Sequence, residues 1–218
     1  MRNKDYLSGT SIFLRQRSDM FRCNTDTALL GHFMKVTSKD TVLDIGCNNG
    51  ALMLYASQYN PIHLYGVDLF EEAIALAQEN LKANHIERFT LFTQDVVHLD
   101  GLKTSVIVCN PPYFDTVDTG HRNMNPFLET ARHEKTLTLE TLMMTAERLL
   151  QEEGRFYLVH RASRIPEIIQ KAEQTSLQPK TMQIVFDENK EEATAVLMEL
   201  IRGYKGKLHV MKPKIIQR

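Results

Sequence analysis

The amino-acid sequence predicts an α/β protein built on a doubly wound, mostly parallel sheet. Runs of β-branched and apolar residues alternate along the chain with segments of helical spacing. The runs show little polar alternation, which is typical of strands that are buried on both faces. The length of 218 residues, with 43% hydrophobic and 24% charged residues, is that of one globular domain. We therefore expect a single domain over residues 1–218, with residues 1–40 forming a basic extension and a helix that pack on it.

Seven strands are expected in the sheet. The predicted strands cover residues 41–45, 62–68, 89–95, 105–110, 154–160, 182–186 and 193–201. Each is a short apolar run bounded by turn-forming or charged residues. No helical pattern separates the last two strands, so a C-terminal antiparallel pair is expected.

Five helices are expected to cover the sheet. The predicted helices span residues 27–35, 51–58, 71–84, 139–150 and 164–176. Thr25 and Asp26 precede the first helix as its expected cap, and acidic residues fill the first turn of the third. The last helix begins near Pro166, which suits a first turn. The polar stretch 114–136 is longer than most loops, and loops of that size are more often functional than idle.

The charge of the chain is balanced overall and uneven locally. With 26 basic and 27 acidic residues the formal net charge is −1, so a polyanion can be held only by a local patch. Both ends of the chain are basic, and residues 202–218 contain no Asp or Glu. The candidate RNA-binding residues at the two ends are Arg15, Arg17, Arg22, Lys205 and Lys207. A plain solvated surface is the alternative interpretation of such charge runs.

Cysteine usage and hydropathy indicate a cytoplasmic protein. The 3 cysteines include no Cys-x-x-Cys pair, which disfavours a disulfide scaffold and a cysteine zinc site. None of the 8 histidines forms a recognised metal-ligand pair, so no metal is expected. No apolar run approaches the roughly 18 residues that span a bilayer. We therefore expect no membrane partner.

A glycine-containing turn follows the first predicted strand of the sheet. Its candidate cofactor-binding residues are Asp44, Gly46, Cys47, Asn48 and Gly50. In an open α/β sheet, ligands bind beside this first strand-to-helix turn. The turn lacks Gly-x-Gly-x-x-Gly, and a carboxylate at the strand end repels a pyrophosphate but suits a cationic ligand. Asn48 stands where a third glycine is often found, and asparagine can adopt a left-handed conformation at modest cost. The alternative is an ordinary glycine turn.

Acidic residues also end the next two strands. Asp68 is placed to accept hydrogen bonds from both hydroxyls of a ribose, and Asp95 to accept one from an adenine amino group. Leu69 and Val96 follow these acids and are expected beside the same ligand. S-adenosylmethionine joins a ribose and an adenine to a sulfonium and an ammonium, so it is the expected cofactor. The alternative for each acid is a helix cap or a solvated strand end.

The tetrapeptide Asn110-Pro111-Pro112-Tyr113 follows the fourth strand and is expected on the same sheet edge. An amino nitrogen attached to a π system is a poor nucleophile because its lone pair is delocalised. The Asn110 side-chain oxygen and the Pro111 carbonyl, each accepting one N–H, would aim that lone pair at a methyl group. Pro112 would stiffen the turn and Tyr113 would stack on a planar target. The alternative is a proline-rich turn with a core tyrosine.

Four segments between Thr41 and Tyr113 resemble, in their order along the chain, the motifs of class I methyltransferases that act on amino nitrogens. These segments are LDIGCNNG, GVDL, TQDV and NPPY. Three further segments narrow the resemblance to one group within this class: RQRSDMFRCNTDTALLGHF, ARHE and LVHRASR. They are similar to the bacterial transfer-RNA adenine-N6 methyltransferases that modify the adenine next to the anticodon of one valine transfer RNA. The resemblance implies a Rossmann-like fold, S-adenosylmethionine as cofactor and tRNA as partner. Asn48 is a departure, because the family usually has glycine there.

Three classes of function are compatible with these residues. The first is methylation of adenine N6 in tRNA by a monomer or a weak homodimer. The second keeps the Asn-Pro-Pro-Tyr chemistry on another amino nitrogen, in protein glutamine, ribosomal-RNA guanine or adenine, or DNA adenine. Only about 40 residues precede the first strand, too few for a helical bundle of the protein-glutamine kind. The third is an RNA-binding module without catalysis, against which the intact tetrapeptide argues.

Overall fold

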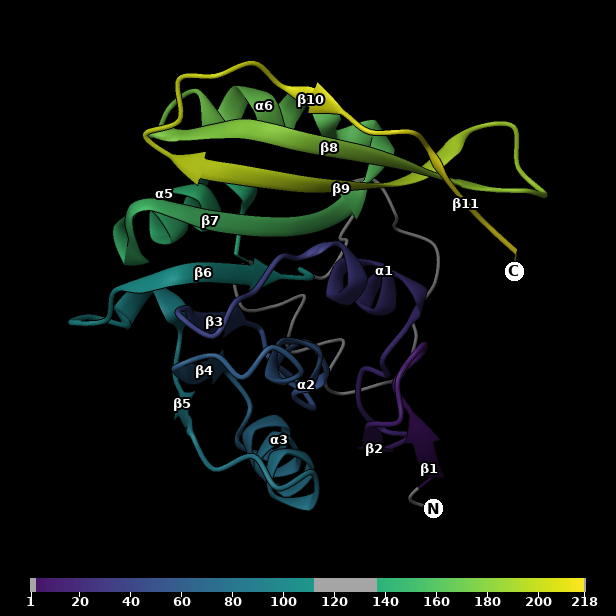
Figure 1. Cartoon of the computed structure of the whole chain (residues 1–218), viewed down its shortest axis with the longest axis vertical. Helices are drawn as coiled ribbons and strands as arrows, with labels where there is room; N and C mark the ends of the chain where they lie inside the picture. The colour runs from purple at the N-terminus through teal and green to yellow at the C-terminus, as the bar shows by residue number, and fades with distance from the viewer. Residues whose placement is uncertain (1–2, 112–136, 218) are drawn as a thin grey trace.

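The computed structural model describes residues 3–111 and 137–217, and it contains one large sheet between two layers of helices (Figure 1). The elements, in chain order, are β1 (Asn3–Tyr6), β2 (Phe13–Gln16), α1 (Thr25–Phe33), β3 (Thr41–Ile45), α2 (Ala51–Ser57), β4 (His63–Asp68), α3 (Glu71–Ala83), β5 (Phe89–Thr93), η1 (Val96–His98), β6 (Thr104–Cys109), α5 (Leu139–Leu149), β7 (Leu150–Arg161), η2 (Ala162–Arg164), α6 (Ile165–Ala172), β8 (Leu177–Asp187), β9 (Ala193–Arg202), β10 (His209–Val210) and β11 (Lys214–Ile216). The two η elements are single 3₁₀ turns. The stretch 114–136 lies within the residues that the structure does not describe.

The large sheet confirms the predicted fold class. Its strand order is β10-β8-β9-β7-β6-β3-β4-β5, with β11 also paired to β8. The strands from β7 to β5 are parallel neighbours, and β9 runs antiparallel to both β7 and β8. The antiparallel C-terminal pair is therefore present as predicted.

The predicted count of seven strands is too low for the described part of the chain, where the sheet has 9 strands. The additional strands, β10 and β11, pair in parallel with β8 and come from the basic C-terminal segment. They span only 2 and 3 residues, so they are too short for a strand periodicity to be visible in the sequence.

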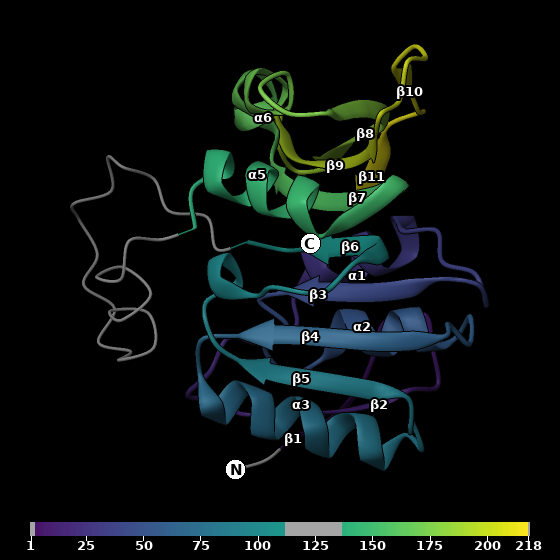
Figure 2. The ribbon, with the colours of Figure 1, turned by 90° about the vertical axis from the view of Figure 1, so that its left-hand side faces the viewer.

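Helices cover both faces of the sheet (Figure 2). Val42 of β3 packs in one core with Leu30 of α1, Leu54 of α2 and Leu81 of α3. The next residue, Leu43, packs in a second core with residues of α5 and α6. Because successive side chains of a strand point to opposite faces, β3 is buried on both sides. This arrangement explains the uninterrupted apolar runs of the central strands.

The expected basic N-terminal extension folds into a hairpin. β1 and β2 form a separate antiparallel sheet of 2 strands, and Gly9 has a φ of 74° in the connection. Leu7 and Leu14 are buried against the core that contains α1 and α2. The hairpin was not predicted, because each strand has only 4 residues.

The cap of α1 is Asn24 rather than the expected pair Thr25 and Asp26. The Asn24 side chain accepts a hydrogen bond from Thr27 N at 2.9 Å, so the helix begins at Thr25. An asparagine oxygen reaches the third helical N–H in this way at many helix starts. Among the described residues, no helix is long and apolar enough to cross a membrane.

Candidate functional site

The carboxyl ends of four parallel strands bring the predicted site residues to one edge of the sheet. Ile45 pairs with Val67 on β4 and with Cys109 on β6. The residues that follow these positions are the glycine turn, Asp68 and Asn110. They therefore meet beside the strand order reversal at β3, where β4 and β6 lie on opposite sides.

The turn after β3 has a backbone that few residue types can adopt. Gly46, Asn48 and Gly50 have φ values of 71°, 45° and 78°. Gly46 N and Cys47 N both donate to Val67 O, at 2.9 and 3.1 Å. A Cβ placed on Gly46 would meet no atom within 4 Å, so open space adjoins the turn at this glycine. Asn48 adopts the left-handed conformation that asparagine tolerates better than most residues.

Asp68 holds this turn in place with its carboxylate. Its Oδ2 accepts from Asn48 N at 2.9 Å and its Oδ1 from Phe70 N at 3.1 Å. Burial is the main cause that raises the pKa of Asp68, and the backbone donors oppose that effect. Each carboxylate oxygen has a second lone pair, so these bonds do not exhaust the capacity of Asp68 to accept hydroxyl protons.

Asp44 has a buried carboxyl group, and no other group of the described chain compensates its negative charge. Only 1% of the residue is exposed, and its Oδ1 is buried without a hydrogen-bond partner among the described residues. Burial raises the pKa of Asp44 well above its usual range, and the nearby charge of Asp68 adds to the shift. A bound cation that donates hydrogen bonds would supply the missing partner. The ammonium group of the expected cofactor fits this requirement, and its sulfonium adds positive charge without donating a hydrogen bond.

The other predicted cofactor residues contribute in different ways. Cys47 is buried, burial raises the pKa of its thiol, and its Sγ lies beside Gly66 of β4. Asp95 is exposed and caps η1 by accepting from Val97 N at 2.9 Å. Val96 is buried in the core, whereas Leu69 is 46% exposed beside Asp68 and offers an apolar surface there.

Asn110 is oriented by a chain of hydrogen bonds that starts at α1. Its Nδ2 donates to Thr27 Oγ1 at 3.0 Å, and Thr27 Oγ1 in turn donates to Asn24 Oδ1 at 3.0 Å. These bonds turn the amide so that Oδ1, the acceptor, lies on the side away from Thr27. Pro111 is buried next to it. Pro112 and Tyr113 lie outside the described residues.

The sequence analysis did not identify Thr27 as part of the site. Thr27 is only 9% exposed, and 83 positions separate it from Asn110 in the chain. The threonine stands in the TDTALL segment, where the only local signal was a helix start. Asn49 was missed as well, although its Nδ2 is buried without a hydrogen-bond partner in the described chain.

Of the N-terminal arginines, Arg15 lies in β2, and Arg17 and Arg22 lie on the segment that leads from β2 to α1. Arg15 pairs with Glu79 of α3 at 3.5 Å, and Arg17 forms a two-bond pair with Asp19. Arg22 is exposed and lies between Phe21 and Cys23. Phe21 O accepts from Asn48 Nδ2 at 2.7 Å, which places this part of the segment beside the turn.

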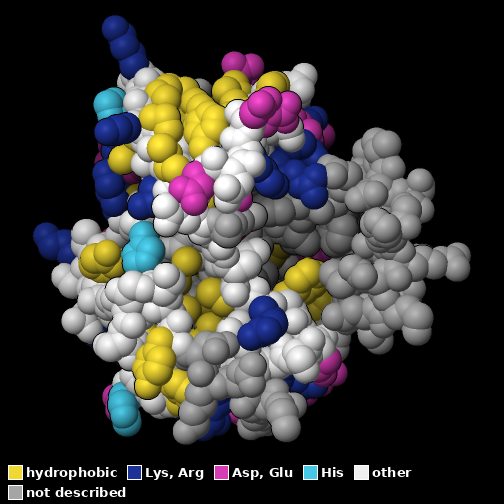
Figure 3. Space-filling view, turned by 90° about the vertical axis from the view of Figure 1, so that its right-hand side faces the viewer, with side chains coloured by type: hydrophobic (Ala, Val, Ile, Leu, Met, Phe, Trp, Pro, Cys, Tyr) yellow, Lys and Arg dark blue, Asp and Glu magenta, His cyan; other side chains and the backbone are white. Residues whose placement is uncertain are grey.

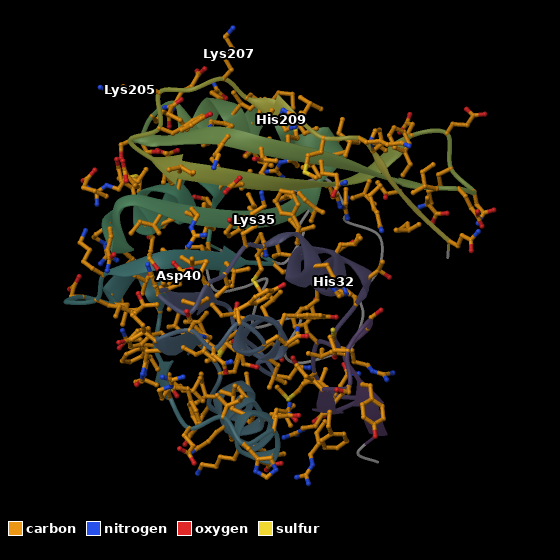
Figure 4. All side chains as sticks on the ribbon, in the orientation of Figure 1. His32, Lys35, Asp40, Lys205, Lys207 and His209 are labelled. Carbon is orange, nitrogen blue, oxygen red and sulfur yellow. The ribbon has the colours of Figure 1, made fainter. Side chains whose placement is uncertain are left out.

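Lys205 and Lys207 lie at the opposite edge of the sheet. Arg202, the last residue of β9, pairs with Leu177, the first residue of β8. β8 runs in the same direction as strands β3 to β7, so the last residue of β9 lies at the amino ends of these strands. The segment that follows β9, with Lys205 and Lys207, therefore starts at that end of the sheet. Figure 4 shows both lysines projecting outward on that segment. This placement does not support one continuous patch with the N-terminal arginines, and the assignment of the two lysines to RNA binding stays a prediction.

Comparison with known proteins gives consistent results. The methyltransferase small domain family matches residues 11–134. The chain is 34% identical over 189 residues to the tRNA1(Val) (adenine(37)-N6)-methyltransferase of Erwinia tasmaniensis, covering 82% of this chain and 74% of that protein. It is 33% identical over 134 residues to the Vibrio cholerae protein of the same name, covering 60% of this chain and 55% of that protein. The alignments thus span about half to three quarters of these relatives.

The fold also matches solved structures. The crystal structure of Methanocaldococcus jannaschii Trm5 in complex with adenosine superposes with a TM-score of 0.69. The match covers 94% of this chain and 56% of that chain, at 16% sequence identity. At this identity the likeness is one of fold alone.

Proposed function

The chain belongs to the family of tRNA1(Val) (adenine(37)-N6)-methyltransferases, and on that premise we propose that it transfers a methyl group from S-adenosylmethionine to the exocyclic N6 of an adenine in tRNA. The adenine next to the anticodon of tRNA1(Val) is the proposed position. The observation that carries the proposal is the meeting of Asp44, Asp68 and Asn110 at one sheet edge. A cation-binding acid, a hydroxyl-binding acid and an amine-binding amide are the three groups that this reaction needs.

Three acids hold the cofactor in this proposal. S-adenosylmethionine, when bound, supplies a methyl group on a positively charged sulfur. Asp68 accepts from the ribose hydroxyls, and Asp44 provides the negative charge that balances the cationic part. Gly46 leaves the space for the ligand to approach the backbone of the turn. Asp95 accepts from the adenine amine, and Leu69 supplies apolar contact.

Asn110 and Pro111 prepare the target amine. The N6 lone pair of adenine is delocalised into the ring, so the nitrogen must become more tetrahedral to react. Asn110 Oδ1 and the Pro111 carbonyl each accept one N–H, which aims the lone pair and stabilises the positive charge that develops on nitrogen. No strong base is needed for this step, because the methylated nitrogen carries a positive charge and then releases one of its protons to water. Tyr113 stacks on the adenine once the base has left its own stack.

A methyl-transfer assay tests the proposed function. Purified protein is incubated with S-adenosylmethionine labelled on the methyl group, together with bulk tRNA, ribosomal RNA or a release-factor protein. We expect the label in tRNA, and N6-methyladenosine in its nucleoside digest. Label in protein glutamine or in ribosomal-RNA guanine would replace the proposal with another amino-nitrogen substrate.

Thr27→Val should lower turnover about 5-fold while leaving cofactor affinity unchanged. The substitution removes the hydroxyl that orients Asn110, and one intramolecular hydrogen bond contributes about 1 kcal/mol. Thr27→Ser keeps the hydroxyl and is the matched control. Single-turnover rates on tRNA measure the effect. A Thr27→Val variant with wild-type turnover would show that the hydrogen bond to Asn110 does not contribute to the reaction.

Basic residues of the two termini should contribute unequally to RNA binding. Figure 3 shows basic side chains in separate groups on the face that it displays. Reversing Arg17 and Arg22 to Glu should raise the KM for tRNA and leave the cofactor affinity unchanged. Each lost phosphate contact should flatten the logarithmic salt slope by about 0.7 to 0.9.

The matched control for this experiment is the double reversal of Lys205 and Lys207 to Glu. Both lysines are exposed, but they lie at the opposite sheet edge, so a smaller rise in KM is expected. Titrations of tRNA at several salt concentrations measure both variants. A larger effect of the lysine pair would assign the main RNA contact to the C-terminal segment.

A further inference from the structure

The basic strand β2 is held on its two edges by different partners. One edge pairs with β1, from Phe13 opposite Tyr6 to Gln16 opposite Asn3. On the other edge lies Asn84, the residue that follows the C-terminal end of α3. Its Oδ1 accepts from Phe13 N at 3.1 Å and its Nδ2 donates to Phe13 O at 2.7 Å. Asn80 makes the same two bonds with Arg15, at 2.8 and 3.0 Å. Two side chains of one helix face thus replace a neighbouring strand.

Asn80 differs from Asn84 in one contact. Its Nδ2 also donates to Asn49 O at 2.9 Å, in the turn between β3 and α2. The side chain is completely buried, and its oxygen and both of its N–H groups are used by these three bonds. Asn84 instead donates a second bond to Asn80 O, within the same helix segment. Asn80 is therefore the amide that joins the backbone of β2 to the cofactor turn.

The chain after β2 also contacts the cofactor turn and the start of α3. Asn48 Nδ2 donates to Phe21 O, and Met20 is buried against Phe70, Ala73 and Leu76. Phe70 lies two positions after Asp68 and donates its N–H to that carboxylate. The segment that carries Arg15, Arg17 and Arg22 is thus anchored on the turn and on the start of α3.

We propose that Asn80 is a positioning residue that couples the cofactor turn to this arginine-bearing segment, so that cofactor binding and RNA binding strengthen each other. The inference rests on the proposed function. A hairpin of two strands is marginally stable alone, so its order depends on what holds its free edge. A ligand that orders the turn around Asn49 O also orders Asn80, and the RNA then meets a segment that has already lost conformational freedom. By linkage, RNA binding tightens cofactor binding by the same factor.

The affinity of a tRNA1(Val) transcript is measured with and without saturating S-adenosylhomocysteine. In the wild-type protein we expect S-adenosylhomocysteine to lower the Kd for tRNA about 5-fold or more. Asn80→Ala should bring this ratio close to 1. Asn84→Ala, which removes the equivalent clamp one helical turn away, should weaken tRNA binding but keep the ratio. A wild-type ratio of 1, or equal loss of the ratio in both variants, would overturn the inference.

Hydrogen exchange in the wild-type protein gives a second test that needs no variant to fold. Arg15 N–H is bonded to Asn80 and Phe13 N–H to Asn84, so the two amides report the two clamps separately. S-adenosylhomocysteine should slow the exchange of the Arg15 amide several-fold more than that of the Phe13 amide. Equal changes at both amides would contradict the inference. Methyl transfer to tRNA, assayed on the same samples, shows separately whether the proposed function holds.

Discussion

Asn110→Ala lowers the single-turnover rate of methyl transfer about 100-fold or more, while the cofactor affinity changes little. The lost acceptor interacts with the amine most strongly when positive charge develops on nitrogen, so its removal affects the transition state more than the bound cofactor. Stopped assays with saturating tRNA give the rate, and calorimetry gives the cofactor Kd.

Asn110→Asp is the matched control for that experiment. The carboxylate keeps an acceptor at the Oδ1 position, and Thr27 can turn its one hydroxyl proton from Asn24 to the second oxygen. We expect this variant to retain more activity than the alanine variant. If cofactor affinity and turnover fall by the same factor in Asn110→Ala, the residue supports the fold of this edge and has no separate role with the amine.

Asp44→Asn weakens cofactor binding roughly 10- to 150-fold, because a hydrogen bond to a charged group contributes about 1.5 to 3 kcal/mol. The same variant should be more stable than the wild-type protein without ligand. The carboxyl is buried and its Oδ1 has no partner in the described chain, whereas the amide has no charge to desolvate. Calorimetry and thermal unfolding measure the two effects. A variant that is less stable and binds as well as wild type would remove Asp44 from the cofactor site.

The stability advantage of Asp44→Asn depends on pH in a defined direction. Burial raises the pKa of Asp44 in the folded protein, so the folded state keeps its proton at a pH where the unfolded state has released it. The stability of the wild-type protein therefore falls as pH rises from about 4, the unfolded value, towards the folded pKa. The advantage of the variant should grow over the same range.

Cofactor binding should show the corresponding proton release. A cation beside Asp44 favours the ionised form, so the wild-type protein releases a proton on binding and its affinity rises with pH. Calorimetry in two buffers of different ionisation enthalpy measures that proton. Asp44→Asn should show a smaller release, and an unchanged release would assign the proton to another group.

The sequence by itself determined the sheet and the acids that end its strands. Apolar periodicity and turn residues are local properties, so β3 to β9, the turn at Gly46 to Gly50 and the position of Asp68 could be read from neighbouring residues. The positive φ of Asn48 was also predictable, because only a few residue types tolerate that region.

Only the tertiary structure decided which distant residues complete the site. Thr27 orients Asn110 across 83 positions, and Asn80 reaches Arg15 across 65. An asparagine inside a helix and a threonine near a helix start carry no local sign of such partners. The sequence likewise did not predict that Lys205 and Lys207 lie at the amino ends of the parallel strands, away from the candidate site. That position depends on the direction in which β9 runs through the sheet. Local patterns set the elements, but side-chain hydrogen bonds between elements exist only after packing has brought the elements together.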